Sequence, residues 1–173
     1  MRKIGQIFRF LIPVIALATL VVFMTGAGRR ERAKEEQIRA NVRRIMEAWN
    51  MHNFDVFNEV YALDFVYHQS PYPDIKGLEA YKQYAAAVLA AYPDWHMTPQ
   101  EVIVEGNTHA APWTGLATNT GKSPLYPFPP TGKQVTFTAC CYGHWVDGKM
   151  VEQWEYVDSL GPLQQLGVIP PMK

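Results

Sequence analysis

The stretch Glu152-Gln153-Trp154-Glu155-Tyr156-Val157-Asp158-Ser159-Leu160, followed closely by Leu163-Gln164-Gln165-Leu166-Gly167, says most about this chain. Its β-branched and aromatic residues predict a β-strand over residues 150–158. Three acidic side chains fall within seven positions of that strand, beside large aromatic side chains. An exposed hairpin has no need of such aromatic bulk, so the strand is a candidate for the wall of a pocket that holds a carboxylate.

The predicted strand has two faces, because successive side chains of a β-strand point in opposite directions. One face carries Glu152, Trp154 and Asp158, and the other carries Gln153 and Glu155. An aspartate at the end of a strand usually accepts hydrogen bonds from the turn or helix that follows it. The alternation alone leaves open which of the two faces lines a pocket.

The remainder of the chain predicts helices first and strands afterwards. Apolar residues at helical spacing predict an amphipathic helix over 31–52, a short helix over 53–61 capped by Asn53, and a helix over 78–92. Strands are predicted at 65–68, 95–97, 101–105, 110–119, 134–145 and 150–158. Asp147-Gly148 is typical of a tight hairpin turn. This order predicts an α+β domain in which three helices pack on a curved, mostly antiparallel sheet and enclose a cone.

A hydrophobic segment precedes this domain. Residues 10–28 contain no charged side chain and are rich in Leu, Ile, Val and Phe, which predicts a membrane-directed segment. The segment is either a signal-anchor transmembrane helix or a signal peptide cut near Thr25-Gly26-Ala27, and basic residues on both sides favour neither orientation. We therefore assign residues 1–30 to this segment and residues 31–173 to the domain. The domain is expected to be anchored to a membrane, or exported if the segment is cleaved.

Composition argues against several classes of protein. The chain has 16 basic and 16 acidic residues. Outside the charged segment from Arg29 to Arg44, the sequence contains no stripe of basic residues, so nucleic-acid binding is not expected. Cys140 and Cys141 are adjacent on a predicted strand and point to opposite faces, so they predict no disulfide. The histidines lack the spacing of metal ligands, and the chain has neither a glycine-rich phosphate loop nor Gly-x-Ser-x-Gly. We expect neither a metal nor a cofactor.

Short motifs in a fixed order resemble the SnoaL-like polyketide cyclases and related ester cyclases of the nuclear-transport-factor-two-like (NTF2-like) superfamily. They are Tyr67-His68-Gln69-Ser70-Pro71, Tyr92-Pro93-Asp94-Trp95-His96, Val104-Glu105-Gly106-Asn107, Pro130-Thr131-Gly132-Lys133, Asp147-Gly148-Lys149-Met150-Val151-Glu152 and Leu163-Gln164-Gln165-Leu166-Gly167. The resemblance implies a conical cavity between a curved sheet and three helices, often in homodimers packed through the sheet. It also implies cofactor-free chemistry, in which a pocket carboxylate moves a proton during an intramolecular aldol cyclisation.

The resemblance also assigns candidate site residues. Where the family commonly reads Glu-His-Trp-Asp, this chain reads Glu152-Gln153-Trp154-Glu155, so Glu155 takes the position of the catalytic carboxylate. Gln153 can orient a carbonyl but neither donates nor takes up a proton at neutral pH. His68 is expected at the cavity rim as an orienting group. His144, on the penultimate strand, could meet Glu155 across the hairpin as a second general base. An exposed carboxylate at Glu155 and a structural histidine at position 68 are the plainer interpretations.

Three interpretations of function remain open at this point. The first is a cofactor-independent cyclase, isomerase or lyase acting on a hydrophobic carbonyl compound, with Glu155 as acid and base and His68 and Gln153 as orienting groups. The second is a non-catalytic module that binds a small apolar ligand at the membrane, which Gln153 and the N-terminal segment favour. A dimerisation domain, the third interpretation, predicts a cavity too small or too full for a ligand. The proline- and aromatic-rich segment 122–130 predicts a stiff flap over a cavity mouth.

Overall fold

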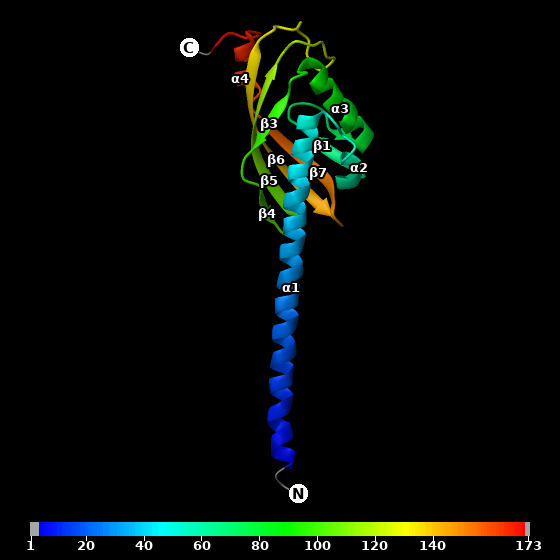
Figure 1. Ribbon diagram of the computed structural model, residues 1–173, viewed down its shortest axis with the longest axis vertical. Coiled ribbons are helices and arrows are strands. Elements are labelled where there is room, and N and C mark those ends of the chain that lie inside the picture. The colour runs from blue at the N-terminus through cyan, green and yellow to red at the C-terminus, as the bar shows by residue number, and fades with distance from the viewer. Residues whose placement is uncertain (1–3, 172–173) are drawn as a thin grey trace.

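The computed structural model describes residues 4–171, with side chains from residue 28 onward (Figure 1). Its helices are α1 (Ile4–Met51), α2 (Phe57–Val60), α3 (Leu78–Ala91) and α4 (Leu160–Leu166). Its strands are β1 (Tyr61–His68), β2 (Ile75–Lys76), β3 (His96–Pro99), β4 (Ile103–Glu105), β5 (Thr108–Thr118), β6 (Gln134–Val146) and β7 (Lys149–Val157). The α+β order predicted from the sequence is confirmed.

One mixed sheet forms the body of the domain. Its strands lie in the order β2-β1-β7-β6-β5-β3, and β4 also pairs with β5. Every pair is antiparallel except β1 with β7, which run parallel. The long central strands curve, and α1 and α3 pack on the same side of the sheet (Figure 1). This arrangement is the NTF2-like fold that the resemblance implies.

The predicted amphipathic helix is part of α1, and its apolar face is buried. The residues predicted for that face are all at most 8 % exposed: Ile38, Val42, Ile45, Met46 and Trp49. A cluster of aromatic rings continues the core beneath α3, where the ring centroids of Tyr61 and Phe65 lie 4.5 Å apart and those of Phe65 and Tyr81 lie 5.1 Å apart. The core therefore joins α1, β1 and α3 on the inner side of the sheet.

Three local predictions differ from the structure. The second helix is only the four residues of α2, and β1 begins immediately after it. Asn53 does not cap α2, because its Oδ1 accepts a hydrogen bond from the backbone N–H of Asp55 in the preceding turn (2.9 Å). The sequence reasoning also missed α4. Oδ1 of Asp158 accepts from the backbone N–H groups of Leu160 and Gly161, so this carboxylate supports the start of α4, as its position at the strand end predicts.

The predicted hairpin turn joins β6 to β7. Asp147 and Gly148 both have positive φ angles, 48° and 79°, which is the conformation that this dipeptide favours in tight hairpins. The turn fixes a register in which Cys141 lies opposite Glu155, and His144 lies opposite Glu152. The two cysteines are free and Cys141 is buried, as expected for neighbours on opposite faces of a strand.

The predicted membrane-directed segment, within residues 1–30, lies almost entirely outside the residues whose side chains the structure describes, and it stays a prediction. In the described part of the chain, no helix combines the length and the apolar character needed to cross a membrane.

Candidate active site

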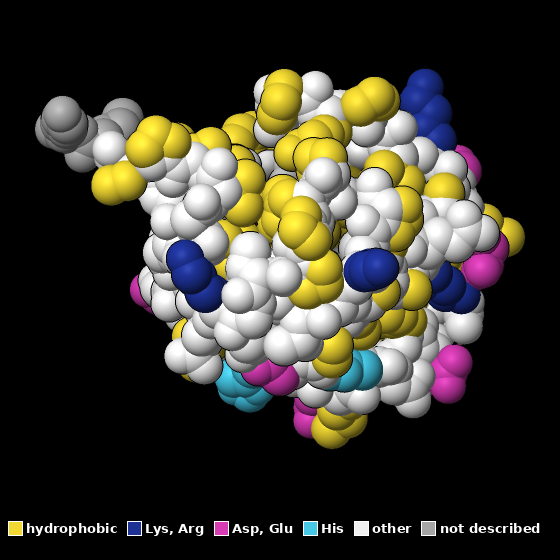
Figure 2. Space-filling model, turned by 90° about the horizontal axis from the view of Figure 1, so that it is seen from above, with side chains coloured by type: hydrophobic (Ala, Val, Ile, Leu, Met, Phe, Trp, Pro, Cys, Tyr) yellow, Lys and Arg dark blue, Asp and Glu magenta, His cyan; other side chains and the backbone are white. Residues whose placement is uncertain are grey.

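A cavity of about 690 Å³ lies between the inner face of the sheet, α1, α3 and α4. Figure 2 views the end of the domain farthest from the N-terminus and shows hydrophobic side chains gathered around a hollow. Most of the lining side chains are aromatic or aliphatic, and among the described residues no lysine or arginine lines the cavity. A cavity of this size and character suits a small, uncharged, apolar molecule.

The proline- and aromatic-rich segment forms part of the cavity wall. Five consecutive residues of it line the cavity: Pro124, Leu125, Tyr126, Pro127 and Phe128. The ring of Tyr126 packs against the ring of Tyr92, the residue that follows α3, at a centroid distance of 5.4 Å. The predicted flap is therefore packed against the rest of the domain through aromatic contacts.

The structure decides which face of β7 lines the cavity. Gln153 and Glu155 line it, and Glu155 is only 9 % exposed. Trp113 Nε1–H donates to Glu155 Oε1, and Gln153 Nε2–H donates to Oε2, both at 2.8 Å. Each carboxylate oxygen thus has one neutral donor, so the plainer interpretation of Glu155 as an exposed carboxylate is wrong.

Small residues on β6 allow Trp113 to reach Glu155. Trp113 lies on β5, and Ala139 is its partner on the intervening strand β6. Cys141, the next inward-facing residue of β6, lies directly opposite Glu155 on β7. Because Ala139 and Cys141 have short side chains, the indole extends over β6 and its N–H meets the carboxylate.

Burial controls the charge of this site. It raises the pKa of Glu155 from 4.5 to about 7, and the hydrogen bonds from Trp113 and Gln153 oppose that rise. Burial and the charge of Glu155 also raise the pKa of Tyr67 and Tyr84, whose hydroxyl groups stay protonated. The cavity therefore contains one carboxyl group that changes charge near neutral pH, which is what general acid–base catalysis requires.

This raised pKa predicts how stability depends on pH. Between about pH 4.5 and about pH 7 the folded chain keeps a proton on Glu155 that the unfolded chain has lost. The free energy of unfolding therefore falls as pH rises through this window, by about 3 kcal/mol, and levels off above it. Denaturant unfolding at both ends of the window, for the natural chain and for Glu155→Gln, measures the difference. Parallel pH profiles for the two chains would contradict the assignment.

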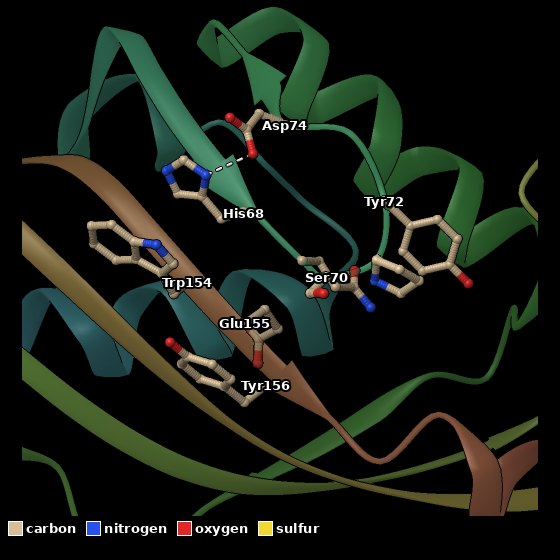
Figure 3. A pocket seen from close by; sticks show the side chains of 9 residues that line it. His68, Ser70, Tyr72, Asp74, Trp154, Glu155 and Tyr156 are labelled. Carbon is tan, nitrogen blue, oxygen red and sulfur yellow. Dashed lines mark hydrogen bonds and ion pairs between the residues drawn. The ribbon is translucent and has the colours of Figure 1, made fainter.

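His68 lies on the other face of the sheet. Its Nδ1 is 2.7 Å from Asp74 Oδ1 and its Nε2 is 2.9 Å from Glu152 Oε1. The ring stacks on Trp154 at a centroid distance of 4.9 Å (Figure 3). Burial acts to lower the pKa of His68, but the two carboxylates outweigh it and raise the pKa. His68 lines a smaller pocket of about 300 Å³ that Glu155 also lines, although the hydrogen-bond partners of the His68 ring are Asp74 and Glu152 rather than Glu155.

The expected contact between His144 and Glu155 is wrong. His144 pairs with Glu152 in the β6–β7 register and is exposed on the outer face, where its ring centroid lies 6.4 Å from that of Tyr142. Positions 144 and 155 point to opposite faces, because Cys141 rather than His144 is the partner of Glu155. The cavity thus brings together Glu155 and Gln153 but neither of the two predicted histidines.

Sequence reasoning gave no role in the site to two residues of β5 that line the cavity, His109 and Trp113. His109 is 2 % exposed, and its Nδ1 accepts a hydrogen bond from Trp145 Nε1–H at 2.9 Å. Burial lowers the pKa of His109 to about 4. The alternation of side chains along β5 places both residues on one face of the strand, and this pattern can be seen in the sequence. Nothing in the sequence, however, identifies that face as the one that lines the cavity.

Comparison with known proteins identifies the family to which the chain is similar and solved structures that share its fold. The family described as SnoaL-like polyketide cyclase matches residues 40–166. A proposed SnoaL-like polyketide cyclase from Jannaschia sp. CCS1 is 20% identical, with a TM-score of 0.71 over 79% of this chain and 95% of that chain. IdmH, a proposed polyketide cyclase from Streptomyces antibioticus, is 24% identical, with a TM-score of 0.65 over 75% and 97%. AclR, a proposed hydroxylase from Streptomyces galilaeus, is 22% identical, with a TM-score of 0.70 over 80% and 86%. No curated protein sequence matches the chain significantly.

Proposed function

Because the chain belongs to the SnoaL-like polyketide cyclase family, we propose that it is a cofactor-independent cyclase, isomerase or lyase for an uncharged, hydrophobic carbonyl compound. The observation that carries this proposal is Glu155, a buried carboxyl group with a pKa of about 7 that lines a cavity of about 690 Å³. A carboxylate tuned to this pKa can remove a proton at neutral pH and return it later in the same cycle.

The proposed reaction is an intramolecular aldol addition or a related proton shift. Glu155 removes a proton from the carbon next to a carbonyl group, and the C–H electron pair forms the carbon–carbon double bond of an enolate. The enolate carbon then attacks a second carbonyl carbon of the same molecule, and a new carbon–carbon bond closes the ring. The protonated Glu155 returns its proton to the resulting alkoxide, so the carboxylate is restored and nothing is oxidised or reduced.

Gln153 and Trp113 have a positioning role in this proposal. Their N–H groups each hold one oxygen of Glu155, so the carboxylate keeps one orientation whether or not it carries a proton. Neither side chain transfers a proton at neutral pH, which leaves Glu155 as the proton carrier. The family histidine that Gln153 replaces is therefore not needed for a mechanism in which one carboxyl group acts as both base and acid.

The lining of the cavity indicates the class of substrate. Trp49, Tyr81, Trp95 and Phe137 are among the side chains that line it, and aromatic faces suit flat apolar rings. No lysine or arginine among the described residues is there to neutralise a phosphate or carboxylate group. An anionic substrate would also be repelled by Glu155 in its charged form, so the substrate is proposed to be neutral.

An aryl-substituted δ-diketone, which closes a six-membered ring by intramolecular aldol addition, tests this proposal. We expect the chain to accelerate ring closure over buffer, with a rate that rises through about pH 7 as Glu155 loses its proton. Product formation is followed by liquid chromatography with mass detection. Tight binding of the diketone without acceleration at any pH would instead support a non-catalytic module for small apolar ligands.

A further inference from the structure

His109 is a second buried polar group in the cavity, and the proton transfer by Glu155 leaves it without a role. Its ring lies over Gly143 of β6, the residue that pairs with it across the sheet. A methyl group on Gly143 would overlap Cε1 of the imidazole and lie 2.8 Å from Nδ1. Because position 143 has no side chain, the His109 ring can extend from β5 across the sheet and lie close to the backbone of β6.

Trp145 determines which ring nitrogen carries the proton. Trp145 Nε1–H donates to Nδ1 at 2.9 Å, and both residues are buried. A neutral imidazole has one protonated nitrogen, so an accepting Nδ1 leaves the proton on Nε2. The lowered pKa of His109 agrees with a neutral ring. His109 is therefore a hydrogen-bond donor through Nε2–H near neutral pH.

Nε2–H points towards the part of the cavity that holds Glu155. Nε2 lies 3.7 Å from Sγ of Cys141, which sits directly opposite Glu155 on the neighbouring strand. The Cys141 thiol donates to the carbonyl oxygen of Ala111 at 3.5 Å, and burial raises its pKa well above its ordinary value, so it is not a nucleophile. Sulfur is a weak acceptor, and a substrate oxygen is a better partner for Nε2–H.

Building on the proposed function, we propose that His109 is a catalytic residue that donates Nε2–H to the carbonyl oxygen of the bound substrate. When Glu155 removes the neighbouring proton, the electron pair of the carbonyl bond moves onto that oxygen, and the hydrogen bond to Nε2–H stabilises the negative charge. The proton stays on His109 throughout. Trp145 is the positioning residue, because its N–H fixes the tautomer that makes this donation possible.

The arrangement of the sheet supports a substrate bound between these two groups. His109, Gly143 and Gln153 form one row across β5, β6 and β7, and Cys141 and Glu155 belong to the next row. Only short side chains, Gly143 and Cys141, occupy β6 between the imidazole and the carboxylate. In this arrangement the substrate carbonyl group lies above Gly143 and Cys141, beside the Trp113 indole, with its oxygen towards Nε2 and its α-carbon towards Glu155.

Naphthol, a flat phenol that emits differently when ionised, tests the donor independently of turnover. The background is the full chain with Glu155→Gln, which removes the competing negative charge. Adding His109→Phe to it, which keeps a ring over Gly143, should weaken naphthol binding about tenfold and lower the ionised fraction of bound naphthol. His109→Gln, which keeps an amide donor, should restore part of the affinity. His144→Phe, on the outer face of the sheet, is the matched control and should change neither quantity.

Kinetics and NMR give two further readouts. With the aryl δ-diketone, His109→Phe in the natural chain should lower kcat about a hundredfold and change KM much less, because the donor acts mainly on the enolate. Nitrogen-15 chemical shifts of the imidazole should show the proton on Nε2, and Trp145→Phe should produce a mixture of the two tautomers. The change in tautomer would show that Trp145 positions the proton on His109, since loss of packing alone does not alter a tautomer.

The outcomes separate this inference from the proposed function. Equal naphthol binding by the Glu155→Gln chains with and without His109→Phe, alongside turnover that needs Glu155, overturns the role of His109 alone. Loss of naphthol ionisation in His109→Phe, with no diketone turnover by the natural chain, supports the donor and overturns the proposed reaction. If His109→Phe does not fold, the NMR measurement decides, and a proton on Nδ1 in the natural chain overturns the inference.

Discussion

Glu155→Gln should reduce turnover of the aryl δ-diketone by about a thousandfold, the typical contribution of a general acid–base group. Glutamine has nearly the same shape, and its amide can still occupy the position between Trp113 and Gln153, so the cavity is preserved. What it lacks is a group that takes up and returns a proton at neutral pH. Steady-state kinetics of purified natural and variant chains at about pH 7 measure the loss.

Glu152→Gln is the matched control for this experiment. Glu152 belongs to the same strand and carries the same functional group, but it faces the outer side of the sheet, where it meets His68. Its replacement should leave turnover within about twofold of the natural chain, since surface substitutions have small effects. Equal losses in the two variants, or full activity in Glu155→Gln, would show that Glu155 is not the proton carrier.

Phe65→Ala should lower the free energy of unfolding by about 4 kcal/mol, the usual cost of removing a fully buried aromatic ring. Phe65 is 0 % exposed and its ring centroid lies 4.5 Å from that of Tyr61 and 5.1 Å from that of Tyr81. Its loss therefore opens a void where β1 packs against α3. Urea unfolding followed by circular dichroism measures the change.

Leu63→Ala is the comparison on the same strand. Leu63 is 85 % exposed, so its truncation removes little buried surface and should cost less than about 0.5 kcal/mol. A difference between the two variants of under about 1 kcal/mol would mean that the cavity left by Phe65 closes on relaxation, and that this part of the core is far more plastic than its close packing indicates.

Much of the fold could be predicted because its signals are local. The period of Ile38, Val42 and Ile45 predicts the buried face of α1, and Asp147-Gly148 predicts the β6–β7 hairpin; both predictions are confirmed. The short helix α4 was not predicted, although the strand-end aspartate that supports its start was identified as an acceptor for a following turn or helix. The N-terminal segment stays a prediction.

The site was only partly predictable, because it depends on pairing between strands. Alternation separates Glu155 from Glu152, but only the order of the strands and the side covered by helices show that the Glu155 face is the inner one. The resemblance led to Gln153 as well, which donates to Glu155. His144 was misplaced because strand parity was not carried from β7 to β6, whereas His68 does line a pocket that includes Glu155. His109 was missed because the space for its ring depends on the absence of a side chain at Gly143 on the neighbouring strand.

The parallel pairing of β1 with β7 has a consequence for the order in which the protein is made. His68 and Glu152, which meet across this pair, are separated by 84 positions. Contacts of such long range form late and slow folding, and during synthesis β1 must wait for β7 to leave the ribosome. Until then the edges of β1 and β6 are open to association with other chains, so a chaperone that holds the nascent domain would act on these edges. The strand that covers these two edges, β7, is therefore also the strand that carries Glu155.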